Sequence, residues 1–181
     1  MRIVGGKYRS RTLQAPKGME TRPTLDQVRE ALFNILQGQV EGTDMLDLYG
    51  GSGAVALEAV SRGAKSAVIC DQSRDAVSVI RKNIASLSCQ DRVTVLQMKD
   101  LSAMARLEQE GRSFDLVFLD PPYRMEMTDM LVRLAAGALL RVGGKVVWEH
   151  SASMEAAEIQ GLRLLSTRKY RDTCLTFYEK L

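Results

Sequence analysis

The 181-residue chain has few of the residues that mark disulfide-rich or zinc-binding proteins. It contains three cysteines, four prolines and one histidine. Cys70, Cys89 and Cys174 are an odd number, are widely spaced and form no C-x-x-C pair. Because only His150 could join them as a ligand, the pattern argues against a zinc site. We expect no metal, a reducing compartment and three small buried thiols.

Long hydrophobic runs are also missing. The longest stretches without a charge, 31–40 and 48–57, have ten residues each, whereas a membrane-spanning helix needs about 18 or more. No apolar leader follows Met1, since charged and glycine residues come at once. What remains is 45% hydrophobic and 26% charged, which is typical of one folded domain. We therefore expect a cytoplasmic protein without membrane contact.

The net charge of +3 is unevenly distributed. Residues 1–24 carry six bases and one acid (+5), whereas residues 25–181 carry 19 bases and 21 acids (−2). Lysine and arginine side chains placed on phosphates release condensed counterions, so a basic segment favours a polyanionic partner. A solvated terminal segment without a partner explains the charge equally well. The candidate contacts are Arg2, Lys7, Arg9 and Arg11.

The order of expected elements indicates an α/β fold behind a short extension. Residues 2–4 and 8–13 alternate around a Gly5-Gly6 turn, which predicts a β-hairpin. A helix follows, because Thr24 and Gln27 form a capping box before an apolar stripe with helical period. From residue 45, apolar strands alternate with amphipathic helices, as in a parallel sheet covered on both faces. The strands are expected at 45–49, 67–70, 93–96, 114–119 and 145–148, and the helices at 54–62, 73–87, 101–110 and 127–140.

After residue 160 the pattern changes to two strands, 162–165 and 174–178, joined by a polar segment over 166–172. They form a terminal hairpin, so at least one late strand runs antiparallel. The predicted fold is a doubly wound, mostly parallel seven-stranded sheet of Rossmann-like type, with a C-terminal antiparallel hairpin and a small N-terminal hairpin-plus-helix extension. We divide the chain into this extension, residues 1–40, and one compact domain, residues 41–181.

A glycine-rich loop, Asp47-Leu48-Tyr49-Gly50-Gly51-Ser52-Gly53, follows the first expected strand. Residues 51–56 fit G-x-G-x-x-G/A, and Asp71 ends the next strand 18 residues after Gly53. Glycines let the backbone approach a ligand, and a carboxylate at this place can hold both hydroxyls of a ribose. The loop alone could be an ordinary strand-to-helix turn. Together with Asp71 it indicates a cofactor that contains adenosine.

Two cofactors of this kind compete, NAD and S-adenosyl-L-methionine. NAD places a pyrophosphate at the helix N-terminus, where a nearby anion is unfavourable. S-adenosylmethionine carries a sulfonium and an ammonium group, which Asp47 would stabilise. A dinucleotide enzyme also needs a substrate domain, for which the chain has no room. We therefore predict S-adenosylmethionine, with Asp100 accepting from the adenine amino group while it caps the helix that begins at Leu101.

The fourth expected strand ends in Asp120-Pro121-Pro122-Tyr123, the most specific motif of the chain. Consecutive prolines make a stiff loop without backbone donors, so the Asp120 carboxylate and the Pro121 carbonyl can accept both hydrogens of an exocyclic amino group. The amine lone pair then points at a sulfonium methyl, while Tyr123 stacks on the base. The alternative is a rigid turn with Tyr123 packed on the surface. We assign catalysis to Asp120, Pro121, Pro122 and Tyr123, with Asp120 orienting the amine or accepting its proton.

These motifs resemble the class I methyltransferases that modify exocyclic amines. Residues 2–11 and 21–36 resemble the bacterial RsmD family, and the likeness spans nearly the whole chain, weakening after about residue 150. It implies methylation of N2 of a guanine, guanine 966, in 16S rRNA on the assembling small ribosomal subunit. Tyr49-Gly50 stands where family members often have Phe-Ala, and we expect the extra glycine to loosen the loop slightly.

The resemblance implies a role for each matched position. Gly51 and Gly53 would hold the methionine part of the cofactor, Asp71 the ribose and Asp100 the adenine. The basic arm would bind 16S rRNA within a small-subunit ribonucleoprotein, and we expect a monomer. The expected cofactor contacts are Arg22, Pro23, Thr24, Asp47, Tyr49, Gly50, Gly51, Ser52, Gly53, Asp71, Gln72, Asp100 and Leu101; the expected RNA contacts are Arg2, Lys7, Arg9 and Arg11.

Two other functions stay open at this point. Asp-Pro-Pro-Tyr also serves adenine-N6 methyltransferases acting on nucleic acid, although the chain has no separate recognition domain. A non-catalytic RNA-binding module could keep the same fold. Near the end of the fifth expected strand, we expect Trp148 and His150 to pack in the core, and Glu149 could line the pocket.

Overall fold

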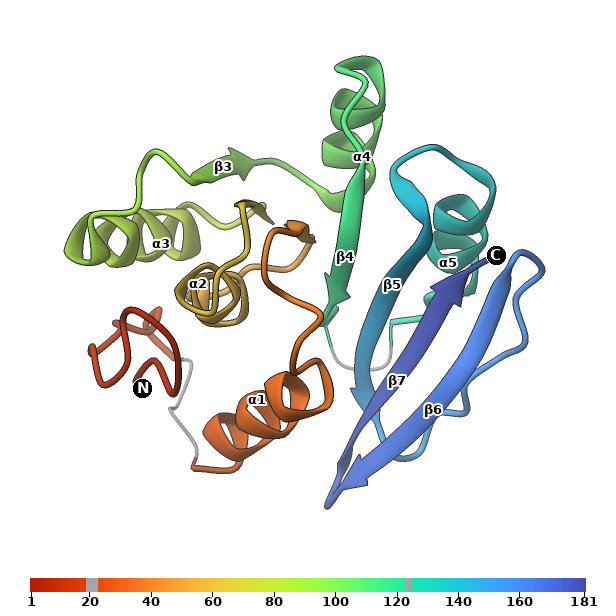
Figure 1. Cartoon of the computed structure of the whole chain (residues 1–181), viewed down its shortest axis with the longest axis horizontal. Coiled ribbons are helices and arrows are strands. Elements are labelled where there is room, and N and C mark those ends of the chain that lie inside the picture. The colour runs from red at the N-terminus through yellow and green to blue at the C-terminus, as the bar shows by residue number, and fades with distance from the viewer. Residues whose placement is uncertain (19–22, 123–124) are drawn as a thin grey trace.

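A computed structural model describes residues 1–18, 23–122 and 125–181 (Figure 1). All the elements expected from residue 24 onward are present, several of them with shifted ends. The helices are α1 (Pro23–Ile35), α2 (Ala54–Ser61), α3 (Arg74–Leu87), α4 (Asp100–Gln109) and α5 (Thr128–Ala136). The strands are β1 (Asp44–Asp47), β2 (Ser66–Asp71), β3 (Val93–Gln97), β4 (Phe114–Leu119), β5 (Leu140–Ser151), β6 (Leu162–Tyr170) and β7 (Thr173–Lys180).

The strands form one seven-stranded sheet in the order β3-β2-β1-β4-β5-β7-β6. Strands β1 to β5 are parallel, and β7 runs antiparallel to both β5 and β6. The doubly wound sheet with a C-terminal antiparallel hairpin is thus confirmed. The chain leaves β1 toward β2 and then returns to its other side for β4, so the switch point lies between β1 and β4. Ligands of such sheets bind at the carboxyl ends of these strands.

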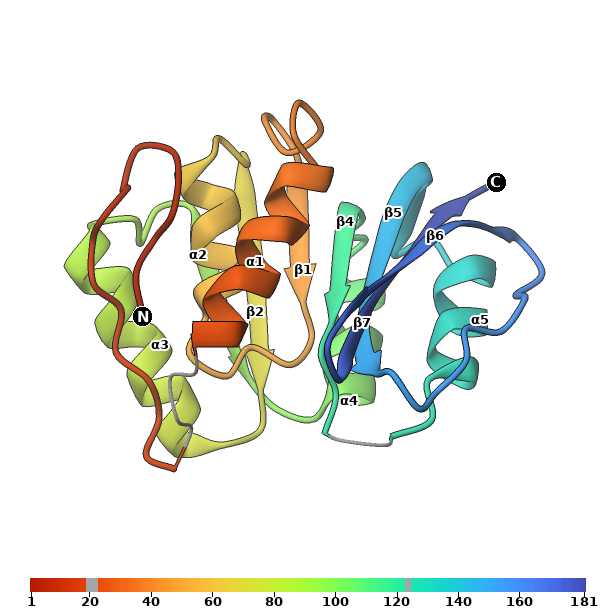
Figure 2. The ribbon, with the colours of Figure 1, turned by 90° about the horizontal axis from the view of Figure 1, so that it is seen from below.

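Two hydrophobic clusters cover the two faces of the sheet. One cluster joins the sheet to α1, α2 and α3, and the other joins it to α4 and α5. Figure 2 shows α1 and α2 in front of β1 and β2, with α4 behind the sheet. Successive strand residues alternate between the clusters, as Phe118 and Leu119 do in β4. In the described ranges no helix is both long and apolar enough to cross a lipid bilayer.

The N-terminal arm, residues 1–18, pairs with itself as expected, but over a shorter length than two full strands. An isolated antiparallel bridge joins Arg2 to Thr12, and the N–H groups of Ile3 and Leu13 donate to the carbonyls of Arg11 (3.0 Å) and Met1 (2.9 Å). Residues 5–10 form turns and bends. The buried carboxylate of Glu58 on α2 accepts from the N–H groups of Val4 (2.9 Å) and Gly5 (2.8 Å). Because these donors bind α2, they cannot extend a β ladder.

The arm and α1 share the first cluster with the sheet. Ile3, Tyr8 and Leu13 are buried together with Leu32 of α1. Helix α1 begins at Pro23, so Thr24 is its second residue and cannot be the expected N-cap. Proline fits this first position because the N–H that it lacks would have no partner in the helix.

Two late strands are longer than their sequence pattern suggests. Strand β5 begins at Leu140, which pairs with Phe114, and the helix before it ends at Ala136, four residues earlier than expected. Strand β6 continues to Tyr170 through a segment that we expected to be a connection. This segment is polar because β6 is an edge strand, and charged residues are common on such edges.

Candidate functional site

A cleft of about 550 Å³ opens at the carboxyl end of the sheet. Its volume is in the range of small-molecule sites. Residues of the glycine loop and residues at the carboxyl ends of β2 and β4 line this cleft together, as the sequence motifs predicted. The lining residues are Leu48, Tyr49, Gly51, Asp71, Gln72, Met98, Lys99, Asp100, Asp120, Pro121, Pro122 and Met125.

The glycine loop is held in place by the carboxylate that ends β2. Gly51 and Gly53 have φ values of +57° and +79°, a region in which residues with a Cβ are strained. The Gly51 N–H donates to one oxygen of Asp71 (2.9 Å), and the Ser73 N–H donates to the other (2.8 Å). Each carboxylate oxygen can accept a further hydrogen bond, so Asp71 can also receive a ligand hydroxyl.

Gly50 permits a close approach between the loop and β2. Its N–H donates to the carbonyl of Cys70 (2.8 Å). A Cβ at this position would lie 2.3 Å from Cγ2 of Ile69 and 3.2 Å from Cδ1 of Ile80. Our expectation that this glycine loosens the loop is therefore wrong, because it allows the loop to pack tightly on β2.

On the opposite side of the cleft, Tyr49 fixes the start of α4. Its hydroxyl donates to Oδ2 of Asp100 (2.5 Å), and the N–H of Leu101 donates to Oδ1 (2.7 Å). Burial and this carboxylate both raise the pKa of Tyr49, so the phenol stays protonated. Asp100 is the first residue of α4 and not its N-cap, which is Lys99. Its carboxylate accepts from the Leu101 N–H in the first turn of α4 and also lines the cleft.

Three carboxyl groups gather where β1, β4 and β5 end. Asp47, Asp120 and Glu149 line a narrow cavity of about 100 Å³ beside α1. Burial raises the pKa of Asp47 to about 7, and Asp120 and Asp71 add to this effect. Burial also raises the pKa of Asp120 to about 6 and that of Glu149 to about 8, with Asp120 and Asp47 adding to the latter.

These carboxyl groups have few partners. Asp47 accepts from the Tyr49 N–H (3.3 Å), and no ion pair reaches Asp47, Asp120 or Glu149 within the described part of the chain. Clustered carboxyls with little access to water resist ionisation and are stabilised as anions by a nearby cation. This cluster can therefore accommodate a positively charged ligand.

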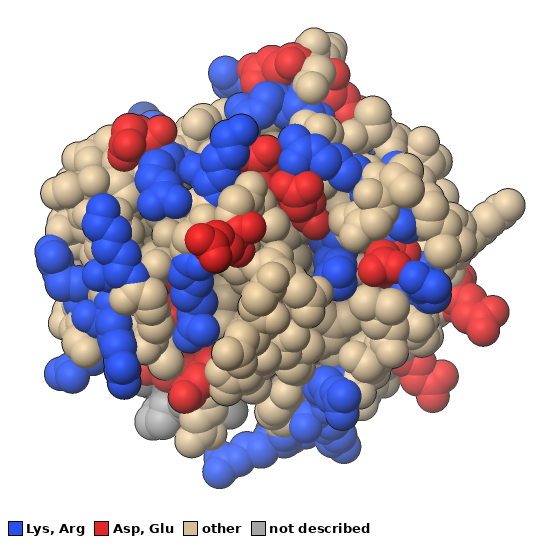
Figure 3. Space-filling model, in the orientation of Figure 1, with Lys and Arg blue, Asp and Glu red and all other residues tan. Residues whose placement is uncertain are grey.

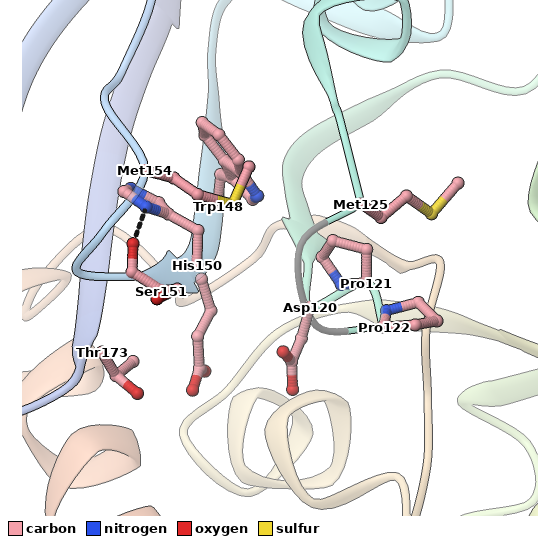
Figure 4. A pocket seen from close by; sticks show the side chains of 10 residues that line it. Asp120, Pro121, Pro122, Met125, Trp148, His150, Ser151, Met154 and Thr173 are labelled. Atoms are coloured by element: carbon pink, nitrogen blue, oxygen red, sulfur yellow. Dashed lines mark hydrogen bonds between the residues drawn. The ribbon is translucent and has the colours of Figure 1, made fainter.

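A second pocket, of about 210 Å³, adjoins the cleft (Figure 4). Asp120, Pro121, Pro122 and Met125 line both spaces, so the proline loop stands between them. In Figure 4 the residues from β4 and its loop face those from β5 across the pocket. The far wall consists of Trp148, Glu149, His150, Ser151, Met154 and Thr173.

Trp148 and His150 pack together, as expected, and also form this far wall. Their ring centroids are 4.1 Å apart. The His150 Nδ1 lies 2.9 Å from the Ser151 carbonyl and Nε2 lies 2.8 Å from the Thr176 hydroxyl. The carbonyl can only accept, so Nδ1 carries the proton and Thr176 donates to Nε2. Burial lowers the pKa of His150, which favours this neutral form.

The remaining expected site residues are dispersed. Gly50, Ser52 and Asp47 line the cavity beside α1 rather than the cleft, Gly53 is the N-cap of α2, and Leu101 is exposed. Arg22 and Tyr123 lie outside the described residues. Pro23 and Thr24 open α1. Sequence reasoning missed Met98, Lys99, Met125, Met154 and Thr173, which belong to no motif.

The cations of the arm are on the surface. Arg2, Lys7 and Arg9 are exposed, and Lys7 lies 5.5 Å from the ring centre of Tyr8. Arg11 donates to the carbonyl of Ser86 on α3. In Figure 3 many lysine and arginine side chains gather on the side of the molecule where the arm and α3 lie. In the described ranges, no group of three or more histidine, cysteine, aspartate or glutamate side chains, the acidic cluster included, is arranged so that it could hold a metal ion.

Comparison with known proteins agrees with this geometry. A family model described as "Conserved hypothetical protein 95" matches residues 1–179. Ribosomal RNA small subunit methyltransferase D of Escherichia coli is 37% identical over 134 residues, which cover 74% of this chain and 66% of that protein. This chain belongs to the RsmD family of rRNA methyltransferases. A second relative, "Putative rRNA methyltransferase YlbH" of Bacillus subtilis, is 32% identical over 183 residues, which cover 99% of both chains.

Solved structures show that this RsmD-family fold covers the whole chain. The yhhF protein of Escherichia coli has a TM-score of 0.86 and 30% identity, covering 99% of this chain and 97% of that one. TTHA0928 of Thermus thermophilus has a TM-score of 0.84 and 29% identity, with 99% of both chains covered.

Proposed function

We propose that this protein transfers a methyl group from S-adenosylmethionine to the exocyclic N2 of a guanine in 16S rRNA of the small ribosomal subunit. One observation supports this most directly. The Asp120-Pro121-Pro122 loop separates a cleft of cofactor size from a smaller pocket, so groups bound on its two sides meet at Asp120. A methyl donor and an acceptor base need this arrangement.

The residues of the cleft fit S-adenosylmethionine. Asp71 can accept from ribose hydroxyls, and Asp100 can accept from the adenine amino group. The carboxyls of the buried Asp47 and of Asp120 at the mouth of the site would stabilise the ammonium and sulfonium charges. When bound, the cofactor supplies a methyl group that is activated by the positive sulfur.

The chain's own residues would orient the acceptor. The Asp120 carboxylate and the Pro121 carbonyl accept the two amine hydrogens, so the nitrogen lone pair points toward the cleft. As the new N–C bond forms and the S–C bond breaks, positive charge moves to the nitrogen. Asp120 stabilises this charge and can accept the proton that leaves, because its pKa of about 6 is closer to neutrality than that of an ordinary carboxyl.

A guanine acceptor agrees with the neighbourhood of Asp120. Trp148 of β5 pairs with Leu119, the last residue of β4, so Asp120 and Glu149, the next residue of each chain segment, lie side by side. Guanine places its N1–H donor beside its amino group, whereas adenine places an acceptor there. When a bound cation keeps both groups ionised, the two neighbouring carboxylates accept from guanine and repel the acceptor of adenine. The N-terminal segments that resemble the RsmD family imply the same base.

Labelled S-adenosylmethionine tests the proposal directly. We would incubate the protein with small ribosomal subunits from a strain that lacks the modification, digest the rRNA and separate the nucleosides by mass. We expect label in N2-methylguanosine. Label on adenosine would overturn the base assignment, and label on protein would overturn the RNA substrate. Absence of transfer by protein that binds the cofactor would support a non-catalytic RNA-binding module.

A further inference from the structure

The end of β6 and the turn that joins it to β7 carry three cations that none of the sequence motifs covers. Arg168, Lys169 and Arg171 form what we call the hairpin-tip patch, and all three are exposed. Their side chains form no hydrogen bond or ion pair with the described residues, although the exposed Asp172 is their neighbour. In Figure 3 basic side chains gather at the lower edge, where Figure 1 shows the end of this hairpin.

Other basic residues of the sheet are paired. Arg163, at the opposite end of β6, contacts Glu179 of β7. Arg141, on β5, pairs with Asp44 (3.0 Å) and Asp115 (2.6 Å). The cations therefore remain unpaired at the end of the hairpin that lies beside the candidate site, where a ligand could use them.

The strand register brings the patch to the edge of the smaller pocket. Glu149 pairs with Leu175, and Leu175 pairs with Arg168, so the three residues form one row on one face of the sheet. Two strand spacings of about 4.8 Å place Arg168 roughly 10 Å from Glu149. The carbonyl of Asp172 also accepts from the Ala152 N–H (2.8 Å), which ties the turn to the segment after β5.

Arg171 occupies a position that favours glycine. Its φ of +55° is in the left-handed region, in which a bulky side chain is strained. Such strain persists where the surrounding structure maintains it, and it is common at functional sites. Here the strained position adds a third cation beside Arg168 and Lys169.

We propose that the hairpin-tip patch binds phosphates of the RNA strand that flank the nucleotide in the smaller pocket. The proposal rests on the proposed function, which supplies the RNA. The site itself is acidic and would repel a polyanion, so cations at its edge are needed to hold the strand. The patch and the basic arm lie on opposite sides of α1 in both ribbon views, so RNA could contact both (Figures 1 and 2).

The salt dependence of subunit binding tests whether the hairpin-tip patch contacts RNA phosphates or is only solvated. The test variant is Arg168→Gln with Lys169→Gln, and the matched control is Arg106→Gln with Arg163→Gln, which removes the same charge far from the pocket. Binding to unmodified small subunits would be measured between 50 and 200 mM salt. A single-strand phosphate contact contributes about 0.7 to the slope of log K against log salt. We expect the test variant to lower this slope by about 1.4, while the control leaves it unchanged.

Arg171→Gly separates binding from folding. Glycine relieves the left-handed strain, so we expect a melting temperature at or above that of the wild type together with weaker binding to the subunit. A merely structural turn residue would give a changed melting temperature and unchanged binding, which would contradict the proposal.

The affinity for S-adenosylmethionine and the rate at saturating subunit should be unchanged in both variants. If the Arg168→Gln, Lys169→Gln variant methylates rRNA and has the salt slope of the wild type, the hairpin-tip proposal is overturned and the proposed function is not. Absence of rRNA methylation by the wild-type protein would instead overturn the proposed function.

Discussion

Tyr49 and Asp100 are joined across the cleft by a hydrogen bond of 2.5 Å between the phenol and the carboxylate. This bond links the loop after β1 to the start of α4. It fixes one carboxylate oxygen while the Leu101 N–H fixes the other. The orientation of Asp100 therefore depends on a side chain from the glycine loop.

Tyr49→Phe should weaken cofactor binding without unfolding the protein. Removing a hydrogen bond to a charged group costs about 1.5–3 kcal/mol, so we expect the Kd for S-adenosylmethionine to rise about 10-fold or more by calorimetry. Tyr178→Phe is the control, because its hydroxyl donates to the Ala157 carbonyl (2.8 Å) away from the cleft. Equal losses of cofactor affinity in the two variants would contradict a specific role for Tyr49.

Asp120→Asn should abolish methyl transfer while leaving cofactor affinity within a few fold. The amide keeps the size of the side chain but loses the negative charge that stabilises the methylated amine. We expect kcat to fall by at least about 100-fold, as when one oriented stabilising group is lost. Asp115→Asn, at the other end of β4, serves as the control. A comparable loss of cofactor binding in Asp120→Asn would assign Asp120 to the cofactor rather than to transfer.

The acidic cluster should make stability depend on pH. Asp47 and Glu149 have pKa values of about 7 and 8, above their ordinary values of 3.8 and 4.5. The native state therefore binds more protons than the unfolded chain between about pH 4 and 8, and the free energy of unfolding falls as pH rises through this window. We expect the melting temperature to fall from pH 5 to 8, and to fall less in Asp47→Asn. The exposed Asp129→Asn control should follow the wild type.

The same cluster should couple cofactor binding to pH. A bound cation favours ionised carboxyls, so the affinity for S-adenosylmethionine should increase between about pH 6 and 8. S-adenosylhomocysteine, which lacks the sulfonium charge, should show a smaller increase. Calorimetry in buffers of different ionisation enthalpy would measure the protons released. Identical pH profiles for the two ligands would place the sulfonium away from these carboxyls.

The sequence predicted those parts of the molecule that depend on local pattern. Strand β4 was expected at 114–119 and is found there, because it is a continuous apolar run. The glycine loop and the Asp120 motif also meet at one sheet edge, as parallel strands require. Glu149 was considered as a pocket residue and lines the pocket, but its place beside Asp120 could not be predicted, since it depends on the register between β4 and β5.

Other features depend on contacts that no local pattern shows. The end of β6 was missed because an edge strand can be polar along its length. The tight packing of Gly50 depends on Ile69, which lies on the neighbouring strand. The arm pairs with itself beside Arg2 and Thr12, but the pairing stops at Val4 and Gly5, whose N–H groups donate to Glu58 of α2.

Gly50→Ala should destabilise the protein through Ile69. A new methyl group 2.3 Å from Cγ2 of Ile69 forces the loop or β2 to move, and such overpacking typically costs about 1–3 kcal/mol. Ile69→Leu removes the branch that causes the clash, so the double variant should lose less stability than the two single variants together. Urea unfolding of the four proteins gives the coupling energy. Strict additivity would show that the clash is relieved elsewhere.

Glu58→Gln should loosen the arm from α2. The buried carboxylate accepts from Val4, Gly5 and the Arg62 guanidinium (2.8 Å), and it lies 3.7 Å from Nε of Arg29. An amide cannot accept all these donors and removes the counter-charge of the half-buried Arg62, whereas the buried Arg29 keeps Asp26 at 3.2 Å. Breaking a buried ion pair typically costs about 3–5 kcal/mol, and we expect a loss at the lower end of this range. We expect urea unfolding to show this loss and limited proteolysis to cleave within residues 1–18.

The control for this change is Glu108→Gln, which removes a partly exposed pair with Arg133 on the other face of the sheet. Exposed pairs contribute about 0–1 kcal/mol, so its stability should be close to that of the wild type. If the Glu58→Gln arm detaches, subunit binding should fall although every arm cation is still present. Unchanged protease resistance in Glu58→Gln would mean that the contacts of Ile3, Tyr8 and Leu13 in the core hold the arm by themselves.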